Sequence, residues 1–204
     1  MDTSAVPLAL VIVAGPQASG KSTVAAALSA ELRLRGERVA VVELDQIAAM
    51  ALPTLPSWEA AHLVFEVTVG LWARTDLTCV IAEGSGSVDE VSRLRDQAPP
   101  DAVVVTLATT ATFETAFARA QADPSRGVSK EYDFLFPVYQ RWADELRRID
   151  PDVAIDTTVL GIDESIRRAK AAIERARRGG TGSSRQPGAG GPAESTRDPF
   201  WGTG

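Results

Sequence analysis

Gly15-Pro16-Gln17-Ala18-Ser19-Gly20-Lys21-Ser22 is the most informative segment of this chain. It matches the pattern G-x-x-x-x-G-K-[ST] at every defined position. The apolar run 8–14 before it has the length and β-branched content of a buried strand, and residues 21–35 after it repeat apolar side chains with a helical period. The sequence therefore predicts a strand, a tight glycine loop and a helix in direct succession.

The loop has the chemistry of an anion-binding site. Its backbone N–H groups can surround an anion, and the dipole of the following helix adds positive potential at the same place. Lys21 can reach the β- and γ-phosphates of a nucleotide, while the Ser22 hydroxyl can ligate Mg²⁺. We therefore expect ATP and Mg²⁺, with the nucleotide bound by Gly15, Pro16, Gln17, Ala18, Ser19, Gly20, Lys21, Ser22 and Thr23. A loop that only turns the chain is disfavoured by the strand and helix on either side.

The rest of the chain alternates short apolar runs with helical patterns. Strands are expected at residues 8–14, 39–44, 79–82, 102–107 and 153–155. Helices are expected at 21–35, 57–74, 87–94, 112–122, 129–148 and 163–178. Strict alternation implies right-handed crossovers and a parallel sheet covered by helices on both faces. The fold class is therefore a three-layer α/β domain with a five-stranded parallel sheet.

Length and composition limit the function classes. The 204 residues allow one domain, which we assign to residues 1–178, and the Gly/Pro-rich segment 179–204 is expected to be a disordered tail. The net charge of −6 disfavours a nucleic-acid partner. The single cysteine, Cys79, excludes an intrachain disulfide and a cysteine-built zinc site. No apolar stretch reaches a membrane span and residues 1–4 lack a basic leader, so a cytoplasmic location without membrane attachment is expected.

Between residues 8 and 178 the chain resembles the P-loop NTPases, and among them small-molecule kinases such as chloramphenicol phosphotransferase, shikimate kinase, adenylyl-sulfate kinase and the zeta-toxin kinases. This resemblance implies the strand order 2-3-1-4-5 and a short lid at about residues 123–130. It also implies that segments 57–74 and 129–148 flank the acceptor site and the lid. Transfer of the γ-phosphoryl group of ATP to a hydroxyl of a small molecule is the implied reaction.

Two carboxylates are candidates for the catalytic and metal sites. Asp45 follows the second predicted strand, at the sheet edge where ligands bind in open α/β folds. In the kinases that this chain resembles, the matching aspartate accepts the proton of the substrate hydroxyl or positions Mg²⁺; the alternative role is an N-cap of a helix at 46–50. Glu83 follows the third strand, where related proteins carry a metal-binding aspartate. The metal ligands are therefore predicted to be Ser22 with Asp45 or Glu83.

Other candidates lie nearer the carboxyl end of the chain. Arg126 in the predicted lid is assigned to the charge that develops on the transferring phosphoryl group, and Arg119 to stacking on the adenine, although solvated helix arginines are common. By resemblance, a loop at Asp156 and Thr157 wraps the nucleotide base; a polar turn is the alternative.

The remaining polar residues that we considered have structural interpretations. His62, the only histidine, is interpreted as a residue on a helix face and not as a base. Ser87 and Glu90 are interpreted as a capping box. Three other functions remain open: a switch ATPase acting on a protein partner, a kinase acting on nucleic-acid ends, and a nucleotide-binding protein without catalysis. The sequence does not indicate the acceptor, the choice of ATP over GTP, or the oligomeric state.

Overall fold

A computed structural model describes residues 6–179 of the chain. The sheet consists of β1 (Ala9–Ala14), β2 (Val39–Glu43), β3 (Cys79–Glu83), β4 (Val103–Thr110) and β5 (Val153–Asp156). All neighbouring strands are parallel, in the order β2-β3-β1-β4-β5. The predicted fold class and strand order are thus confirmed.

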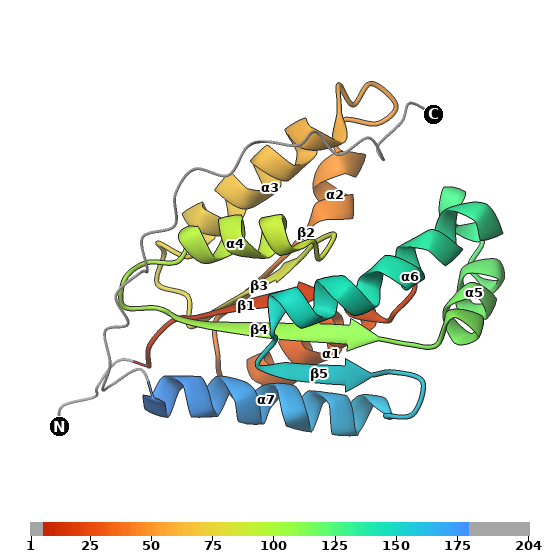
Figure 1. Ribbon diagram of the computed structural model, residues 1–204. Helices are drawn as coiled ribbons and strands as arrows, with labels where there is room; N and C mark the ends of the chain where they lie inside the picture. Colours follow the sequence, from red (N-terminus) through yellow and green to blue (C-terminus); the bar gives the residue numbers. More distant parts are fainter. Residues whose placement is uncertain (1–5, 180–204) are drawn as a thin grey trace, which may run out of the picture.

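Helices cover both faces of this sheet (Figure 1). They are α1 (Lys21–Leu34), α2 (Leu44–Ala49), α3 (Trp58–Trp72), α4 (Val88–Asp96), α5 (Phe113–Ala122), the short 3₁₀ helix η1 (Val128–Lys130), α6 (Tyr132–Ile149) and α7 (Ile162–Gly179). Helices α1 and α7 pack on one face, and α3, α4 and α6 pack on the other. Within residues 6–179, no helix is long and apolar enough to cross a membrane.

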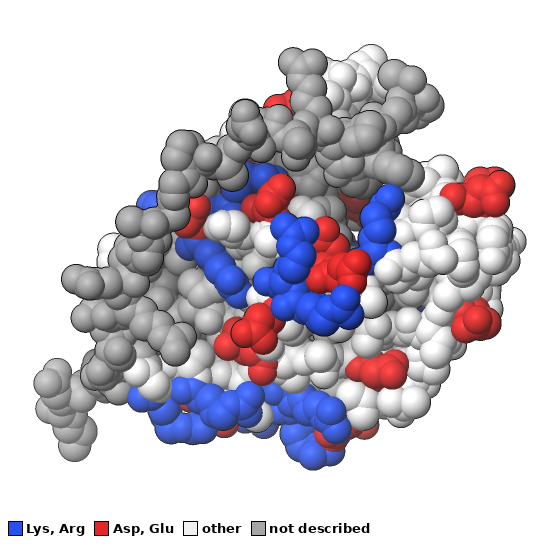
Figure 2. All heavy atoms as spheres, viewed as in Figure 1, with Lys and Arg blue, Asp and Glu red and all other residues white. Residues whose placement is uncertain are grey.

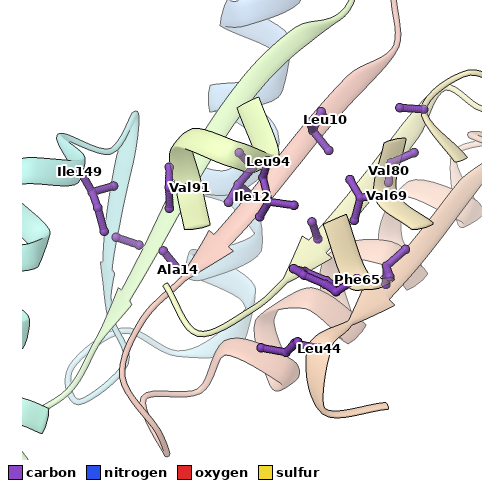
Figure 3. Close-up of a cluster of buried hydrophobic side chains, with 14 of the residues drawn as sticks. Leu10, Ile12, Ala14, Leu44, Phe65, Val69, Val80, Val91, Leu94 and Ile149 are labelled. Carbon is purple, nitrogen blue, oxygen red and sulfur yellow. The ribbon is translucent and has the colours of Figure 1, made fainter. Parts of the chain in front are cut away.

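The central strand β1 is buried on both faces, which explains its continuous apolar sequence. Leu10, Ile12 and Ala14 point toward the core formed with α3 and α4, as Figure 3 shows. Ala9, Val11 and Val13 point toward the core formed with α1 and α7. This rigid strand ends at the glycine loop, so the core of the domain fixes the position of the loop.

The predicted boundaries agree with the structure to within a few residues, with three differences. The helix predicted at residues 129–148 is divided into η1 and α6, which begins at Tyr132. β4 continues to Thr110, three residues beyond its predicted end. The segment after β2 forms the short helix α2, which begins at Leu44 directly after the strand. The predicted disordered tail lies outside the described residues, apart from Gly179 at the end of α7.

Candidate active site

The glycine loop lies between the end of β1 and the start of α1. It needs two glycines for different physical reasons. Gly15 has a φ of 156°, and a Cβ there would lie 2.7 Å from the Thr109 carbonyl oxygen, so a side chain cannot fit. Gly20 is the N-cap of α1 with a φ of 97°, in the left-handed region that favours glycine. No side chain caps α1, so its first N–H groups remain available to an anion.

Side chains from three other segments hold the loop in place. The Ser19 and Thr109 hydroxyl oxygens lie 2.6 Å apart in a buried hydrogen bond. The Tyr139 hydroxyl of α6 donates to the Gln17 carbonyl at 2.9 Å, and the Thr157 hydroxyl donates to the Ser19 carbonyl at 2.8 Å. These contacts fix the loop before any ligand binds, which lowers the entropy cost of binding phosphate.

Lys21, Ser22 and Glu83 come together at the start of α1. The Ser22 hydroxyl donates to Glu83 Oε2 at 3.3 Å, and Lys21 Nζ lies 3.6 Å from Glu83 Oε1. Burial raises the pKa of Glu83, an effect that Lys21 opposes and that the negative charges of Asp45 and Glu43 reinforce. The hydroxyl and carboxylate oxygens are the hard ligands that Mg²⁺ prefers, so these residues fit a magnesium site. Within residues 6–179, no group of three His, Cys, Asp or Glu side chains forms a metal site by itself.

Asp45 lies in the first turn of α2, and its side chain is exposed. The N-cap of α2 is Glu43, without a side-chain capping bond, so the alternative of Asp45 as an N-cap is wrong. The helix begins at Leu44, earlier than the sequence indicated, and Leu44 packs into the core as its first residue. Glu43 pairs in register with Glu83 across β2 and β3, so Glu43, Asp45 and Glu83 all lie at this edge of the sheet.

The predicted arginines lie on the opposite side of the glycine loop. Arg119 donates to the hydroxyl of Thr157 at 2.8 Å and to its carbonyl at 2.9 Å, so both residues lie beside Ser19. Arg126 pairs with Asp123 at 3.1 Å, between α5 and η1. Burial raises the pKa of Tyr139, and the positive charges of Arg119 and Arg126 oppose that rise, so both lie near this phenol.

Asp156 has a structural contact. Its carboxylate accepts from the Thr158 backbone N–H at 2.9 Å, in a turn at the end of β5. Its neighbour Thr157 contacts the glycine loop. Of the two predicted residues, Thr157 therefore lies at the loop and Asp156 lies in the turn.

A buried contact between His62 and Glu90 was not predicted. Glu90 is 1% exposed. Its Oε1 accepts from the Gly86 N–H at 2.9 Å, and its Oε2 accepts from the Ser85 hydroxyl at 3.1 Å and lies 2.8 Å from His62 Nδ1. The capping box is therefore half correct: the Ser87 hydroxyl accepts from the Glu90 N–H, but the Glu90 side chain binds the preceding loop instead of Ser87. A Cβ on Gly86 would lie 2.5 Å from the Gly15 nitrogen, so this loop packs directly on the glycine loop.

No family model and no curated protein sequence matches the chain. Solved structures do resemble it. A shikimate kinase from Bacteroides thetaiotaomicron has 16% identity and a TM-score of 0.60 over 81% of this chain and 98% of that one. A shikimate kinase from Acinetobacter baumannii in complex with shikimate has 15% identity and a TM-score of 0.59, over 84% and 95%.

A sugar kinase from a Janibacter species is similar at 20% identity and a TM-score of 0.55, over 84% of this chain and 98% of that chain. These structures share the fold of the P-loop small-molecule kinases. At such low identity, the comparison establishes that fold for this chain and no particular substrate.

Proposed function

We propose that this protein transfers the γ-phosphoryl group of ATP to a hydroxyl group of a small molecule. The observation that carries the proposal is the position of Lys21, Ser22 and Glu83 at the start of α1, with Asp45 at the adjacent strand end. Kinases act mainly by positioning their substrates and by stabilising charge, and this arrangement offers groups for both tasks. The kinase structures that share the fold support the same reaction type.

Each residue has a distinct proposed task. The loop N–H groups and Lys21 bind the β- and γ-phosphates, and Ser22 with Glu83 would hold Mg²⁺. The ion, when bound, neutralises charge on the phosphate oxygens. We assign Asp45 to the acceptor hydroxyl, because it is exposed at the sheet edge and Glu83 already contacts Ser22. As a base it would accept the hydroxyl proton while the oxygen attacks the γ-phosphorus and the bond to the ADP oxygen breaks.

The nucleotide base is proposed to lie on the other side of the loop. Arg119 is fixed there by two hydrogen bonds that it donates to Thr157, and a base stacked on the guanidinium would lie beside the end of β5. Arg126 would release Asp123 and turn toward the phosphates when the segment 123–130 closes as a lid. The Arg126–Asp123 contact is partly exposed, so exchanging it for a phosphate contact costs little.

Replacing Asp45 by asparagine tests the proposed reaction. If Asp45 receives the acceptor proton, Asp45→Asn binds Mg²⁺·ATP almost normally but transfers the phosphoryl group about 10²–10⁴-fold more slowly. ATP affinity is measured by calorimetry and transfer by ADP release. Asp163→Asn is the matched control, because Asp163 lies in the first turn of α7 on the other side of the sheet.

Two other results of this experiment are informative. Weaker ATP binding that is restored by added Mg²⁺ would assign Asp45 to the metal. Full transfer activity in Asp45→Asn would contradict the proposal. It would favour a switch ATPase that acts on a protein partner.

A further inference from the structure

The sheet edge that carries the glycine loop divides into two unlike halves. On the β4 and β5 side, Arg119 and Arg126 supply positive charge near the loop. On the β2 and β3 side lie α2, the start of α3 and the loop 83–87. If the base occupies the first half, as proposed above, the γ-phosphate faces the second half, and the acceptor must bind there.

The segments that form the acceptor half contain no lysine or arginine. Their single histidine, His62 on α3, contacts the buried Glu90 carboxylate. Residues 39–73, which include β2, α2 and α3, contain neither lysine nor arginine. The same holds for residues 83–92 after β3. In Figure 2, basic side chains gather along α7, which packs on the opposite face of the sheet from α2 and α3. Any counter-charge for an anionic acceptor would have to come from beyond these segments.

Arg74 and Arg93, which directly follow these two segments, and Lys21 of the glycine loop are already engaged. Arg93 donates to the buried Glu66 carboxylate at 2.7 Å. Arg74 lies beyond the C-terminal end of α3, away from the site, and donates to the carbonyl of Gln97 at 3.1 Å. Lys21 contacts Glu83 and is assigned to the phosphates. None of these three cations is placed to receive an acceptor carboxylate or phosphate.

The acceptor half carries acidic groups instead. Glu43 pairs in register with Glu83 across β2 and β3, and Asp45 follows in the first turn of α2 with an exposed side chain, so three acidic residues lie at this edge of the sheet. Within the described part of the chain, residues 6–179, neither Glu43 nor Asp45 forms an ion pair or a side-chain hydrogen bond. A bound Mg²⁺ ion would offset part of this charge, but the γ-phosphate adds negative charge of its own. An anion that entered this half would meet repulsion without a compensating contact.

We infer that the acceptor is an alcohol without a carboxylate or phosphate group, either uncharged or carrying an amine. This inference rests on the proposed phosphotransferase function and narrows its substrate. An ammonium group could pair with Glu43, and an uncharged polyol would need no counter-charge. Shikimate, which is bound to one of the similar kinases, is a carboxylate and is therefore predicted to be a poor acceptor for this chain.

Matched compounds that differ in one charged group test the inference. One series consists of glucose, glucosamine and glucuronate. A second series consists of uridine and uridine monophosphate, and shikimate is tested as a separate anionic compound. Each is supplied with Mg²⁺·ATP, and the phosphorylated product is measured by mass spectrometry. The expected result is a kcat/KM at least about tenfold higher for the uncharged or amine compound than for its anionic counterpart, or about 1.4 kcal/mol in transition-state binding.

Charge removal at Glu43 provides the second measurement. Glu43→Gln should raise kcat/KM for the anionic compound relative to its uncharged counterpart by about two- to fivefold, the range expected for one partly solvated charge. Glu174→Gln is the matched control, because Glu174 lies on α7 on the opposite face and half of its side chain is exposed. It should leave the ratio unchanged.

The outcomes distinguish the two proposals. Equal or better transfer to glucuronate, uridine monophosphate or shikimate overturns the acceptor inference but leaves the phosphotransferase function standing. If Glu43→Gln leaves the ratio of kcat/KM for anionic and uncharged compounds unchanged, the charge of Glu43 is not the cause of the discrimination. ATP hydrolysis without transfer to any compound in either series counts against the phosphotransferase function itself, and the acceptor inference fails with it.

Discussion

Replacing Glu90 by glutamine perturbs the buried group that ties α3 and α4 to the loop 83–87. In the structure the Glu90 carboxylate accepts from the Gly86 N–H and the Ser85 hydroxyl and contacts His62 at 2.8 Å. Burial alone would raise the pKa of Glu90, but these three partners outweigh burial and the net pKa is lowered. The carboxylate is therefore ionised in the folded protein at neutral pH.

The expected cost follows from these contacts. A hydrogen bond to a charged group contributes about 1.5–3 kcal/mol, and glutamine keeps the shape and one accepting oxygen but loses the charge. We therefore expect Glu90→Gln to lower the free energy of unfolding by about 2–4 kcal/mol at pH 7. For a domain of this size, that corresponds to a fall in melting temperature of about 5–15 °C. Glu174→Gln, with its exposed side chain, should change stability by less than about 0.5 kcal/mol.

The pH dependence of the stability difference tests whether the charge of Glu90 causes it. A carboxyl group with a lowered pKa in the folded state stabilises the fold above its unfolded value, near 4.5, and loses that contribution as pH falls through the folded pKa. The difference between the wild type and Glu90→Gln, measured by urea unfolding, should be largest near pH 7 and shrink below pH 4.5. A difference that is absent at pH 7, or that grows in acid, would refute this account of Glu90.

Two further predictions follow from the site and from the composition of the tail. Glu83→Gln should slow phosphoryl transfer by at least about 10–100-fold, because it removes the charge of a proposed Mg²⁺ ligand. The pKa of Glu83 is raised by burial, so its charge destabilises the fold above pH 4.5. This variant should therefore melt no lower than the wild type at pH 7, and a lower melting temperature would contradict the argument. Removing residues 180–204 should leave melting temperature and ATP affinity unchanged, because a Gly/Pro-rich tail buries little surface; a large fall in either would show that Phe200 and Trp201 dock.

Much of the fold could be predicted because its signals are local. The glycine loop, the apolar run before it and the helical period after it are contiguous, and together they indicate the phosphate-binding edge of the sheet. The continuous burial of β1 explains why its sequence is apolar without alternation. The strand order came from family resemblance, since no local pattern states which strands are neighbours.

The contacts that complete the site could not be predicted, because they join residues far apart in the chain. Ser22 and Glu83 are 61 positions apart, Ser19 and Thr109 are 90 apart, and Tyr139 lies 122 positions from Gln17. His62 and Glu90 were each assigned to a local role on their own helices. Their contact arises only when α3 and α4 pack side by side on the sheet.

The fate of the γ-phosphoryl group in the wild type and in Lys21→Ala tests the central claim most directly. ATP labelled at the γ-phosphate is incubated with Mg²⁺ and an alcohol acceptor from the series above, and the phosphate ester is quantified. The wild type should form the ester, and Lys21→Ala should form it at least about 10³-fold more slowly, with its cooperative unfolding retained. Ester formation at the wild-type rate in Lys21→Ala would contradict the claim that this loop binds and activates the nucleotide.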